Sequence, residues 1–160
     1  MHRWLVLLVL AACACGGGGP TTYENDARAA LNGGDLPKAI RVAEDGLAQD
    51  EVKKDPAAAW RLEQIRLDAL ATSRKGADVK QELDRLAAIY PKQVSASLYR
   101  SLADKAKTVN DVPGAIEILT AGDQRFPAEH ASFVDAIGAL KGDAAMDPAT
   151  VKRLKALGYL

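Results

Sequence analysis

The sequence contains few of the residues on which most enzymatic and ligand-binding sites depend. Its two cysteines, Cys13 and Cys15, lie near the start, and His130 is the one histidine beyond the first dozen residues. The body of the chain therefore offers no disulfide bond and no group of cysteines that could hold zinc. Aromatic residues make up 5% of the 160 residues, which disfavours a sugar pocket lined with stacked rings.

An excess of charge is also missing. The 21 Lys and Arg residues balance the 21 Asp and Glu residues, so the chain lacks the basic surface typical of nucleic-acid binders. His130 has no acidic partner beside it on a helix, because adjacent Glu129 points in another direction and Asp135 lies five positions along. Gly16 to Gly19 are not followed by the Lys-Ser or Lys-Thr of a phosphate loop. We therefore expect a non-catalytic protein without cofactor or metal, in which His130 is a solvated helix residue.

A short apolar run opens the chain. Arg3 precedes nine apolar residues, Trp4 to Ala12. Nine residues rise about 14 Å as a helix, whereas the hydrocarbon core of a bilayer is about 30 Å thick. The run is too short to span a membrane and is typical of a secretory signal. We expect residues 1–12 to be absent from the mature chain.

The end of this run, Leu10-Ala11-Ala12-Cys13, resembles the lipobox of bacterial lipoproteins. The resemblance covers only the leader and implies that Cys13 receives diacylglycerol, that the signal is cut before it, and that acyl chains anchor the mature chain. Ala14 is not the Asp that resembles an inner-membrane retention signal, which favours the outer membrane. An ordinary cleaved signal and cleavage before Cys15 remain as alternatives. Residues 13–20, rich in glycine, would form a short flexible tether.

From residue 21 onward, helix-forming residues dominate, and signals for helix starts and stops recur every 15–20 residues. Asp35, Asp55 and Asp111 can each cap a helix with proline in its first turn, and Asp78 and Asp147 are expected to cap two more. Thr21 and Glu24 resemble a capping box. Counted from these caps, the sequence predicts eight helices and no strand, over residues 22–31, 35–48, 55–74, 78–90, 92–108, 111–126, 128–140 and 147–158.

An internal repeat groups these helices in pairs. The segment Asp35-Leu36-Pro37-Lys38-Ala39-Ile40 matches Asp111-Val112-Pro113-Gly114-Ala115-Ile116, which lies 76 residues further on. Asp78 to Leu83 is interpreted as a degenerate copy between them. A period of 34–40 residues with two helices per unit is typical of an α-solenoid. We therefore expect an all-α domain, residues 21–160, of about four antiparallel helical hairpins.

The repeat resembles the tetratricopeptide family. The resemblance is carried by small residues beside the turns and by a closing proline, and it is clearest in the third unit. The matching residues are Gly34, Asp35 and Ala39, then Tyr99, Leu102, Ala103, Ala106, Asn110, Asp111, Ala115 and Pro127. It implies that the first helices of the units line a concave face that holds a peptide or a partner helix. Another hairpin repeat or an irregular helical bundle remains an alternative.

Three polar residues on the first helix of the third unit, Arg100, Asp104 and Lys107, could line such a face. Trp60 is expected in the core. In the last helix Val151, Leu154 and Leu157 form one apolar stripe, which should cover the end of the stack, with Tyr159 and Leu160 folding over the cap at Gly158.

The sequence thus indicates a membrane-anchored adaptor or accessory subunit of the bacterial envelope, with its domain in the periplasm or at the cell surface and a protein partner of unknown identity. Two other classes remain open. A periplasmic lipoprotein for a small ligand or glycan would need a closed pocket, and a structural spacer would need no specific partner at all.

Overall fold

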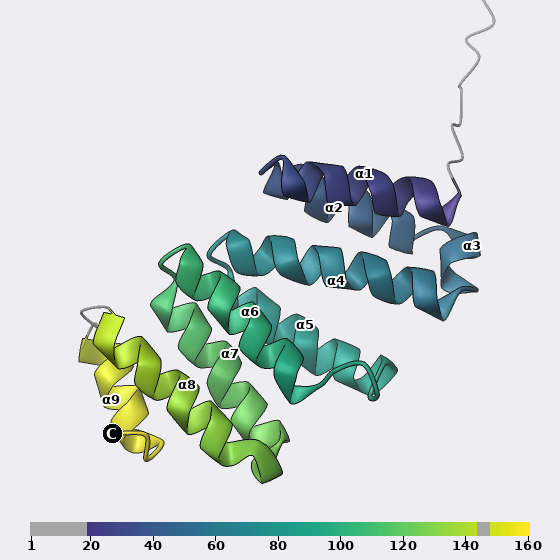
Figure 1. The fold of residues 1–160 in the computed structure, drawn as a ribbon. Coiled ribbons are helices and arrows are strands. Elements are labelled where there is room, and N and C mark those ends of the chain that lie inside the picture. Colours follow the sequence, from purple (N-terminus) through teal and green to yellow (C-terminus); the bar gives the residue numbers. More distant parts are fainter. Residues whose placement is uncertain (1–18, 144–147) are drawn as a thin grey trace, which may run out of the picture.

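The computed structural model describes residues 19–143 and 148–160, and this part of the chain is helical without strands. Figure 1 shows the order of the helices. Their bounds are α1 Pro20–Asn32, α2 Leu36–Leu47, α3 Asp50–Lys53, α4 Pro56–Thr72, α5 Gly76–Ile89, α6 Ala96–Thr108, α7 Val112–Arg125, α8 His130–Asp143 and α9 Pro148–Ala156, with a 3-10 turn, η1, at Pro127–Glu129. The predicted all-α class is confirmed.

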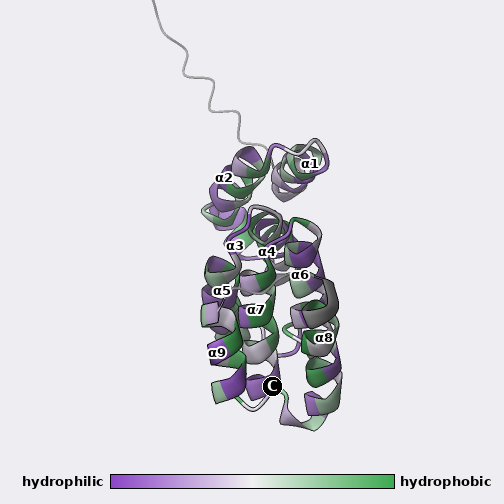
Figure 2. Cartoon of the chain, turned by 90° about the vertical axis from the view of Figure 1, so that its left-hand side faces the viewer, coloured by the Kyte–Doolittle hydropathy of each residue, from purple (hydrophilic) through white to green (hydrophobic). Residues whose placement is uncertain are grey.

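The helices fall into a front set and a back set. Figure 1 shows α1, α4, α6 and α8 in front, and we call these the first helices; α2, α5, α7 and α9 lie behind them, and we call these the second helices. In Figure 2, α4 and α7 lie between the outer members of the two sets. Neighbours along the chain pack together: α1 on α2, both on α4, α4 and α5 on the α6–α7 pair, and α7 on α8. Each helix pair, such as α1–α2 or α6–α7, therefore packs mainly on the helices that come directly before and after it in the chain.

One element was not predicted. A single turn, α3 at Asp50–Lys53, connects α2 to α4. Its surroundings in the sequence are charged, but Val52 is fully buried and holds the turn against the core formed by α1, α2 and α4. A lone apolar residue among Asp, Glu and Lys carries no periodicity, so the pattern gave no signal for this helix.

The pairs α1–α2 and α6–α7 are equivalent. The starts of all four helices, and the ends of α1 and α6, are offset by the same 76 residues. In each pair a glycine of the second helix faces a tyrosine of the first. A Cβ atom on Gly46 would lie 2.8 Å from the Cβ of Tyr23, and one on Gly122 would lie 3.0 Å from the Cβ of Tyr99. The sequence match predicted equivalent turns in the two pairs, but it did not predict this close contact between glycine and tyrosine.

The turn of each pair also repeats. Asp35 accepts a hydrogen bond from the backbone N–H of Lys38 at 3.2 Å, and Asp111 accepts one from Gly114 at 3.1 Å. The residue before each cap has positive φ, 78° at Gly34 and 60° at Asn110. These two aspartates confirm the predicted caps of α2 and α7.

The predicted cap at Asp78 is wrong. α5 begins at Gly76, preceded by Lys75, and Asp78 lies in its first turn. The backbone N–H of Gly76 donates instead to Asp111 Oδ2 at 3.2 Å, so one carboxylate caps both α5 and α7. The middle copy of the repeat is therefore shifted by three residues, and Lys75 takes the position that aspartate holds in the other two.

Two further helix starts differ from expectation. α1 begins at Pro20, one residue before the predicted domain boundary, and no side chain caps it. The Thr21 capping box is absent because the helix starts before Thr21, and Glu24 instead pairs with Arg28 and Arg61. α6 begins after Ser95 rather than at residue 92, since the chain first makes a turn in which the N–H of Val94 donates to the carbonyl of Tyr90. The predicted cap at Asp147 lies outside the described residues.

The largest core cluster spans α4 to α9, and smaller, alanine-rich clusters join α1 and α2 to α4. Trp60 is only partly buried, at the edge of the largest cluster, where its ring lies 5.3 Å from that of Tyr90. Of the stripe predicted for α9, Leu154 is fully buried, whereas Leu157 is 42% exposed. The helix ends at Ala156, so Leu157 no longer follows the buried face.

Candidate protein-interaction face

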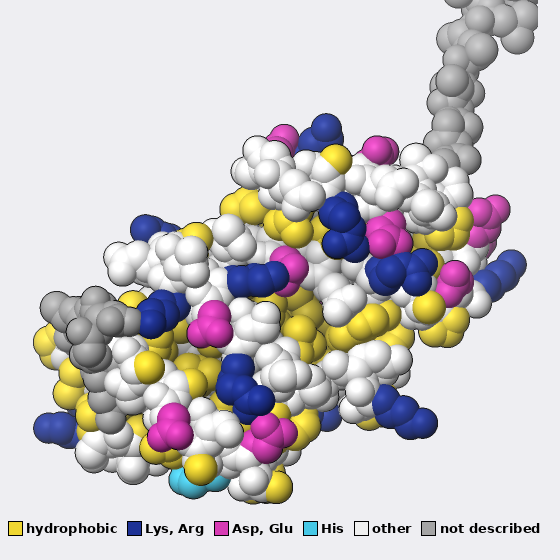
Figure 3. Space-filling view, in the orientation of Figure 1, with side chains coloured by type: hydrophobic (Ala, Val, Ile, Leu, Met, Phe, Trp, Pro, Cys, Tyr) yellow, Lys and Arg dark blue, Asp and Glu magenta, His cyan; other side chains and the backbone are white. Residues whose placement is uncertain are grey.

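The first helices form the broad surface that Figure 3 presents, which we call the front face. On it, hydrophobic side chains lie in the hollows between helices, and basic and acidic side chains stand close to one another along the ridges. The resemblance to tetratricopeptide repeats predicts the partner site on this face, so its construction decides what the site can bind.

Ion pairs cross the front face between α1 and α4, between α4 and α6, and between α6 and η1, the turn that precedes α8. We call these three contacts the front-face ion pairs. They join Arg61 Nε to Glu24 Oε2 at 2.6 Å between α4 and α1, Lys105 Nζ to Asp68 Oδ1 at 2.6 Å between α6 and α4, and Arg100 Nη1 to Glu129 Oε2 at 2.8 Å between α6 and η1. Each bridges residues far apart in the sequence and joins two neighbouring elements of the front face. Because these side chains are partly exposed, each pair contributes modestly to stability.

The ion pair between Glu24 of α1 and Arg61 of α4 changes the pKa of both residues. The hydrogen bond from Arg61 is the main cause of a pKa below the ordinary range for Glu24, with burial opposing it and Arg28 adding to it. The same bond raises the pKa of Arg61. Both groups therefore stay charged across the physiological range.

The three predicted partner-binding residues lie on α6, but they are not equally available. Arg100 is engaged with Glu129, and its guanidinium carbon lies 5.5 Å from the ring centroid of Phe133 in α8, a cation–π contact. Asp104 is exposed and Lys107 is half-buried. Arg100 therefore also holds α6 to α8, whereas Asp104 presents its carboxylate to solvent. Their role in binding stays a prediction.

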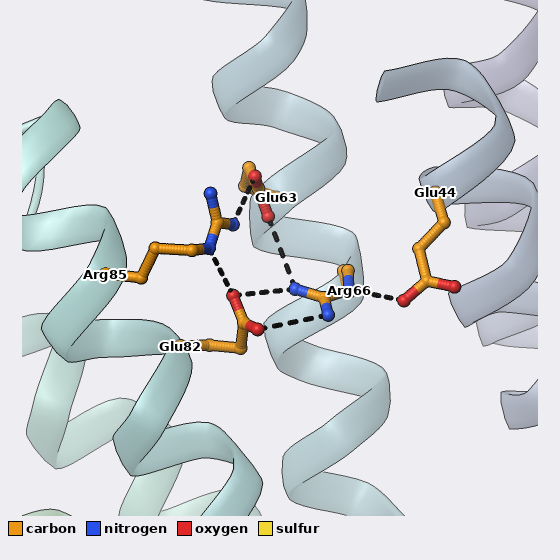
Figure 4. A network of polar contacts seen from close by, with 5 residues as sticks. All are labelled: Glu44, Glu63, Arg66, Glu82 and Arg85. Atoms are coloured by element: carbon orange, nitrogen blue, oxygen red, sulfur yellow. Dashed lines mark hydrogen bonds and ion pairs between the residues drawn. The ribbon is translucent and has the colours of Figure 1, made fainter. Parts of the chain in front are cut away.

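A second polar network joins the second helices to α4 (Figure 4). Arg66 Nη1 lies 2.8 Å from Glu82 Oε2 of α5, and Arg66 Nε lies 2.9 Å from Glu44 Oε1 of α2. Arg85 Nη2 lies 2.6 Å from Glu63 Oε1, and Arg85 Nε lies 2.8 Å from Glu82 Oε2. The network thus connects three helices through two arginines and three glutamates.

Burial and charge oppose each other in this network. Burial disfavours the charged form of Arg66, but the hydrogen bonds that it donates to Glu82 and Glu44 outweigh this and leave its pKa above the ordinary range. Burial raises the pKa of Glu82, and its bonds to Arg66 and Arg85 more than reverse this, so the pKa is lowered. Glu63 is only 4% exposed, and its Oε2 has no hydrogen bond and lies 3.7 Å from Arg66 Nη1. Such a network rigidifies the junction between pairs more than it stabilises it.

A third cluster was missed by sequence reasoning. Asp123 of α7 is 8% exposed, and its carboxylate accepts a hydrogen bond from the hydroxyl of Tyr159 and lies 2.9 Å from Nδ1 of His130. Burial, the hydrogen bond and the charge of Asp123 raise the pKa of Tyr159. The side chain of His130 is 65% exposed, as expected, but it is tied to α7. Spacing does not reveal the full cluster, because Tyr159 lies 36 residues from Asp123.

These clusters are suited to holding helices together. Within residues 19–143 and 148–160, no group of three His, Cys, Asp or Glu side chains has the geometry to hold a metal ion. In the same ranges, no helix combines the length and apolarity needed to cross a bilayer. Cys13, Cys15 and the tether lie outside the described residues.

Comparison with known proteins adds no assignment. The chain matches no protein-family model, and neither curated proteins nor solved structures show significant similarity to it.

Proposed function

We propose that this chain is a lipid-anchored, non-catalytic protein-interaction module of the bacterial envelope, whose helix pairs form a tetratricopeptide-like solenoid. The observation that carries the proposal is the front face. Its first helices lie side by side, and the front-face ion pairs join neighbouring elements across it. A surface whose geometry is fixed before binding loses little conformational freedom on association.

Two features support the tetratricopeptide-like part of this proposal. The pairs α1–α2 and α6–α7 share helix starts, capping aspartates and Tyr–Gly contacts at an offset of 76 residues. Successive pairs also pack on one another in chain order. A solenoid built in this way presents one helix of each pair on a continuous surface, where a peptide or a partner helix can bind.

The anchor is tested by metabolic labelling with an alkyne fatty acid, followed by membrane fractionation. We expect the native chain to be labelled and to sediment with membranes. Cys13→Ala should lose the label and move to the soluble fraction, whereas the matched variant Cys15→Ala should behave like the native chain. Label retained in Cys13→Ala and lost in Cys15→Ala would place the lipid on the second cysteine. Label on neither native nor variant chain would contradict the anchor.

The front face is tested by site-specific photo-crosslinking in cells. A photo-reactive amino acid replaces Asp104, which is exposed on α6, or Gln81, which is exposed on α5, one of the second helices. We expect one envelope protein to crosslink from position 104 and not from position 81. Crosslinks only from position 81 would put the partner on the second helices. No crosslink from either, with thermal stabilisation by a small molecule, would favour the ligand-binding alternative.

A further inference from the structure

The turns that join α1 to α2, α4 to α5 and α6 to α7 share one backbone form but differ in charge. We call them the first, second and third turns. In each, the residue before the cap position has positive φ: 78° at Gly34, 59° at Arg74 and 60° at Asn110. The cap position itself holds aspartate in the first and third turns and Lys75 in the second. The first and third turns therefore offer a carboxylate, and the second offers two basic side chains.

The second turn lies against the third and is bound there by two hydrogen bonds. Arg74 Nε donates to the carbonyl oxygen of Val109 at 2.7 Å, and the N–H of Gly76 donates to Asp111 Oδ2 at 3.2 Å. The backbones also approach closely, since a Cβ atom on Gly76 would lie 2.1 Å from the Cα of Gly114. The structure thus contains one complete example of a basic turn bound to an acidic one.

The first turn carries the same two acceptors. The residues 76 positions before Val109 and Asp111 are Gly33 and Asp35. Asp35 Oδ1 accepts from the N–H of Lys38. Among the described residues, no donor is bound to Asp35 Oδ2 or to the carbonyl of Gly33. The acceptors that hold the second turn on the third are therefore present at the first turn without their donors.

A surface cavity of about 430 Å³ lies over these acceptors, and we call it the N-terminal seat. It lies on α1–α2, the pair at one end of the array (Figure 1). Its lining includes Asp26, Ala30, Gly33, Asp35, Lys38 and Val42. At the offset of 76 residues, these positions are equivalent to those through which α6–α7 contacts α4 and α5. The cavity therefore has the place and the acceptors of a docking site for a helix-to-helix turn.

Two substitutions within the seat indicate its occupant. Leu102 and Gly114 are buried in the α6–α7 pair, and exposed Asp26 and Lys38 take their places in α1–α2. A carboxylate in place of leucine favours a basic group over an apolar helix face, and the lysine holds the occupant further out than Gly76 lies from Gly114.

We propose that the N-terminal seat binds a partner protein through the N-terminus of a helix that an arginine precedes. The guanidinium reaches the carbonyl of Gly33, and the first N–H of the helix reaches Asp35 Oδ2. A second copy of this chain does not offer its own second turn, because Arg74 and Gly76 donate within their own chain. The seat is separate from the front face, so the inference does not rest on the proposed function.

The probe for this site is a synthetic peptide of residues 70–89 of this chain, which contains the second turn followed by α5. A hydrocarbon staple between positions 84 and 88, both exposed on α5, holds the peptide helical. Fluorescence anisotropy follows its binding to the full chain in detergent micelles. We expect saturable binding, because the seat repeats the acceptors to which this segment is bound in the fold.

Two substitutions each remove one side of a hydrogen bond. Arg74→Ala in the peptide and Asp35→Asn in the chain should each weaken binding about tenfold, since each removes the charged partner of a hydrogen bond. Asparagine also caps helices, so Asp35→Asn stays folded, which circular dichroism verifies. Asp104→Asn is the matched control, because it removes an exposed carboxylate of α6 outside the seat.

Lys38→Gly tests the seat by a gain of binding, which an unfolded variant cannot give. It should strengthen binding at least about threefold, because two backbones can then approach as they do at Gly114. No binding by either the native chain or Lys38→Gly overturns the proposal, as does binding that Asp35→Asn leaves unchanged. Protection from hydrogen exchange at residues 109–114 instead of 33–38 also overturns it, because the peptide would then have displaced α5.

A photo-reactive amino acid at position 29, an exposed alanine that lines the seat, tests the partner in cells. We expect a crosslink that Asp35→Asn abolishes, with the adduct in the partner beside an arginine that precedes a helix. An adduct on a second copy of this chain, or on a partner segment without that arginine, overturns the proposal.

Discussion

Asp111 should be worth about twice as much to stability as its equivalent, Asp35. Both cap the second helix of a pair through one backbone N–H. Asp111 also accepts from the N–H of Gly76, the first residue of α5. No earlier helix reaches Asp35 in this way, because α1–α2 is the first pair described. The two positions therefore form a matched comparison of one cap against two.

The magnitude follows from the two hydrogen bonds. Loss of an N-cap side chain costs about 1 kcal/mol, so Asp35→Ala should lower the free energy of unfolding by about that amount. Asp111→Ala removes two caps and leaves the N–H of buried Gly76 without its acceptor, for a total of about 2 kcal/mol. Asp111→Asn keeps one carbonyl oxygen and should fall between the two. At about 3 °C per kcal/mol for a domain of this size, the melting temperature should drop by about 3 °C for Asp35→Ala and about 6 °C for Asp111→Ala.

Urea unfolding followed by circular dichroism at 222 nm measures these differences directly. The slope with urea should match the native chain in all three variants, since the folded and unfolded surfaces do not change. Equal losses for Asp35→Ala and Asp111→Ala would refute the shared cap. A loss at Asp111 confined to a changed slope would point to the unfolded state instead.

Further substitutions probe other parts of the fold. Gly76→Ala should lower the free energy of unfolding by about 3 kcal/mol or prevent folding, because its Cβ would lie 2.1 Å from the backbone of α7. Gly138→Ala should instead raise the stability of the chain in thermal melts by about 0.5–1 kcal/mol, because a Cβ atom there would meet no described atom within 4 Å. Equal effects of the two substitutions would contradict the packing described. Arg66→Met should cost about 2 kcal/mol in urea unfolding, since it leaves Arg85 as the one basic partner of Glu63 and Glu82 among the described residues. The pKa of Glu82 is lowered on folding. Its contribution to the free energy of unfolding is therefore present above the unfolded pKa and is lost as pH falls through the folded pKa. Glu82→Gln should flatten the fall in stability at acid pH. The pKa of Tyr159 is raised on folding, so its contribution is present below the unfolded pKa of about 10 and is lost as pH rises through the folded pKa; Tyr159→Phe should remove that alkaline loss in melts between pH 8 and 12.

The helical class and most helix ends were predictable because their causes are local. Asp35, Asp55 and Asp111 each accept hydrogen bonds from N–H groups two or three residues away, and prolines in the first turn fix the same starts. The starts of α5 and α6 were not, since one depends on an aspartate 35 residues away and the other on a turn that follows α5. Local signals specify a helix end only where its partners are local.

The candidate site was predictable to a lesser degree. Polar residues at helical spacing place Arg100, Asp104 and Lys107 on α6, but spacing does not reveal that Arg100 is occupied by Glu129. The network around Arg66 escaped for the same reason, because its members come from three helices separated by 16 and 22 residues at the hydrogen bonds that link them. Such pairings depend on how the helices pack against one another, and no regular spacing in the sequence indicates them.

The weakness of the repeat in the middle pair has a structural cause. α4 contacts α1 and α2 on one side and α5 and α6 on the other, so it is buried on more faces than the other first helices. On this helix Arg66 reaches Glu44 of α2 and Glu82 of α5, and Glu63 pairs with Arg85 of α5. A buried acid such as Glu63 interrupts the apolar pattern from which a repeat is recognised. The middle copy is therefore the one in which the sequence match should fade, and the shift of its cap from Asp78 to the aspartate of the next pair follows from the same crowding at Gly76.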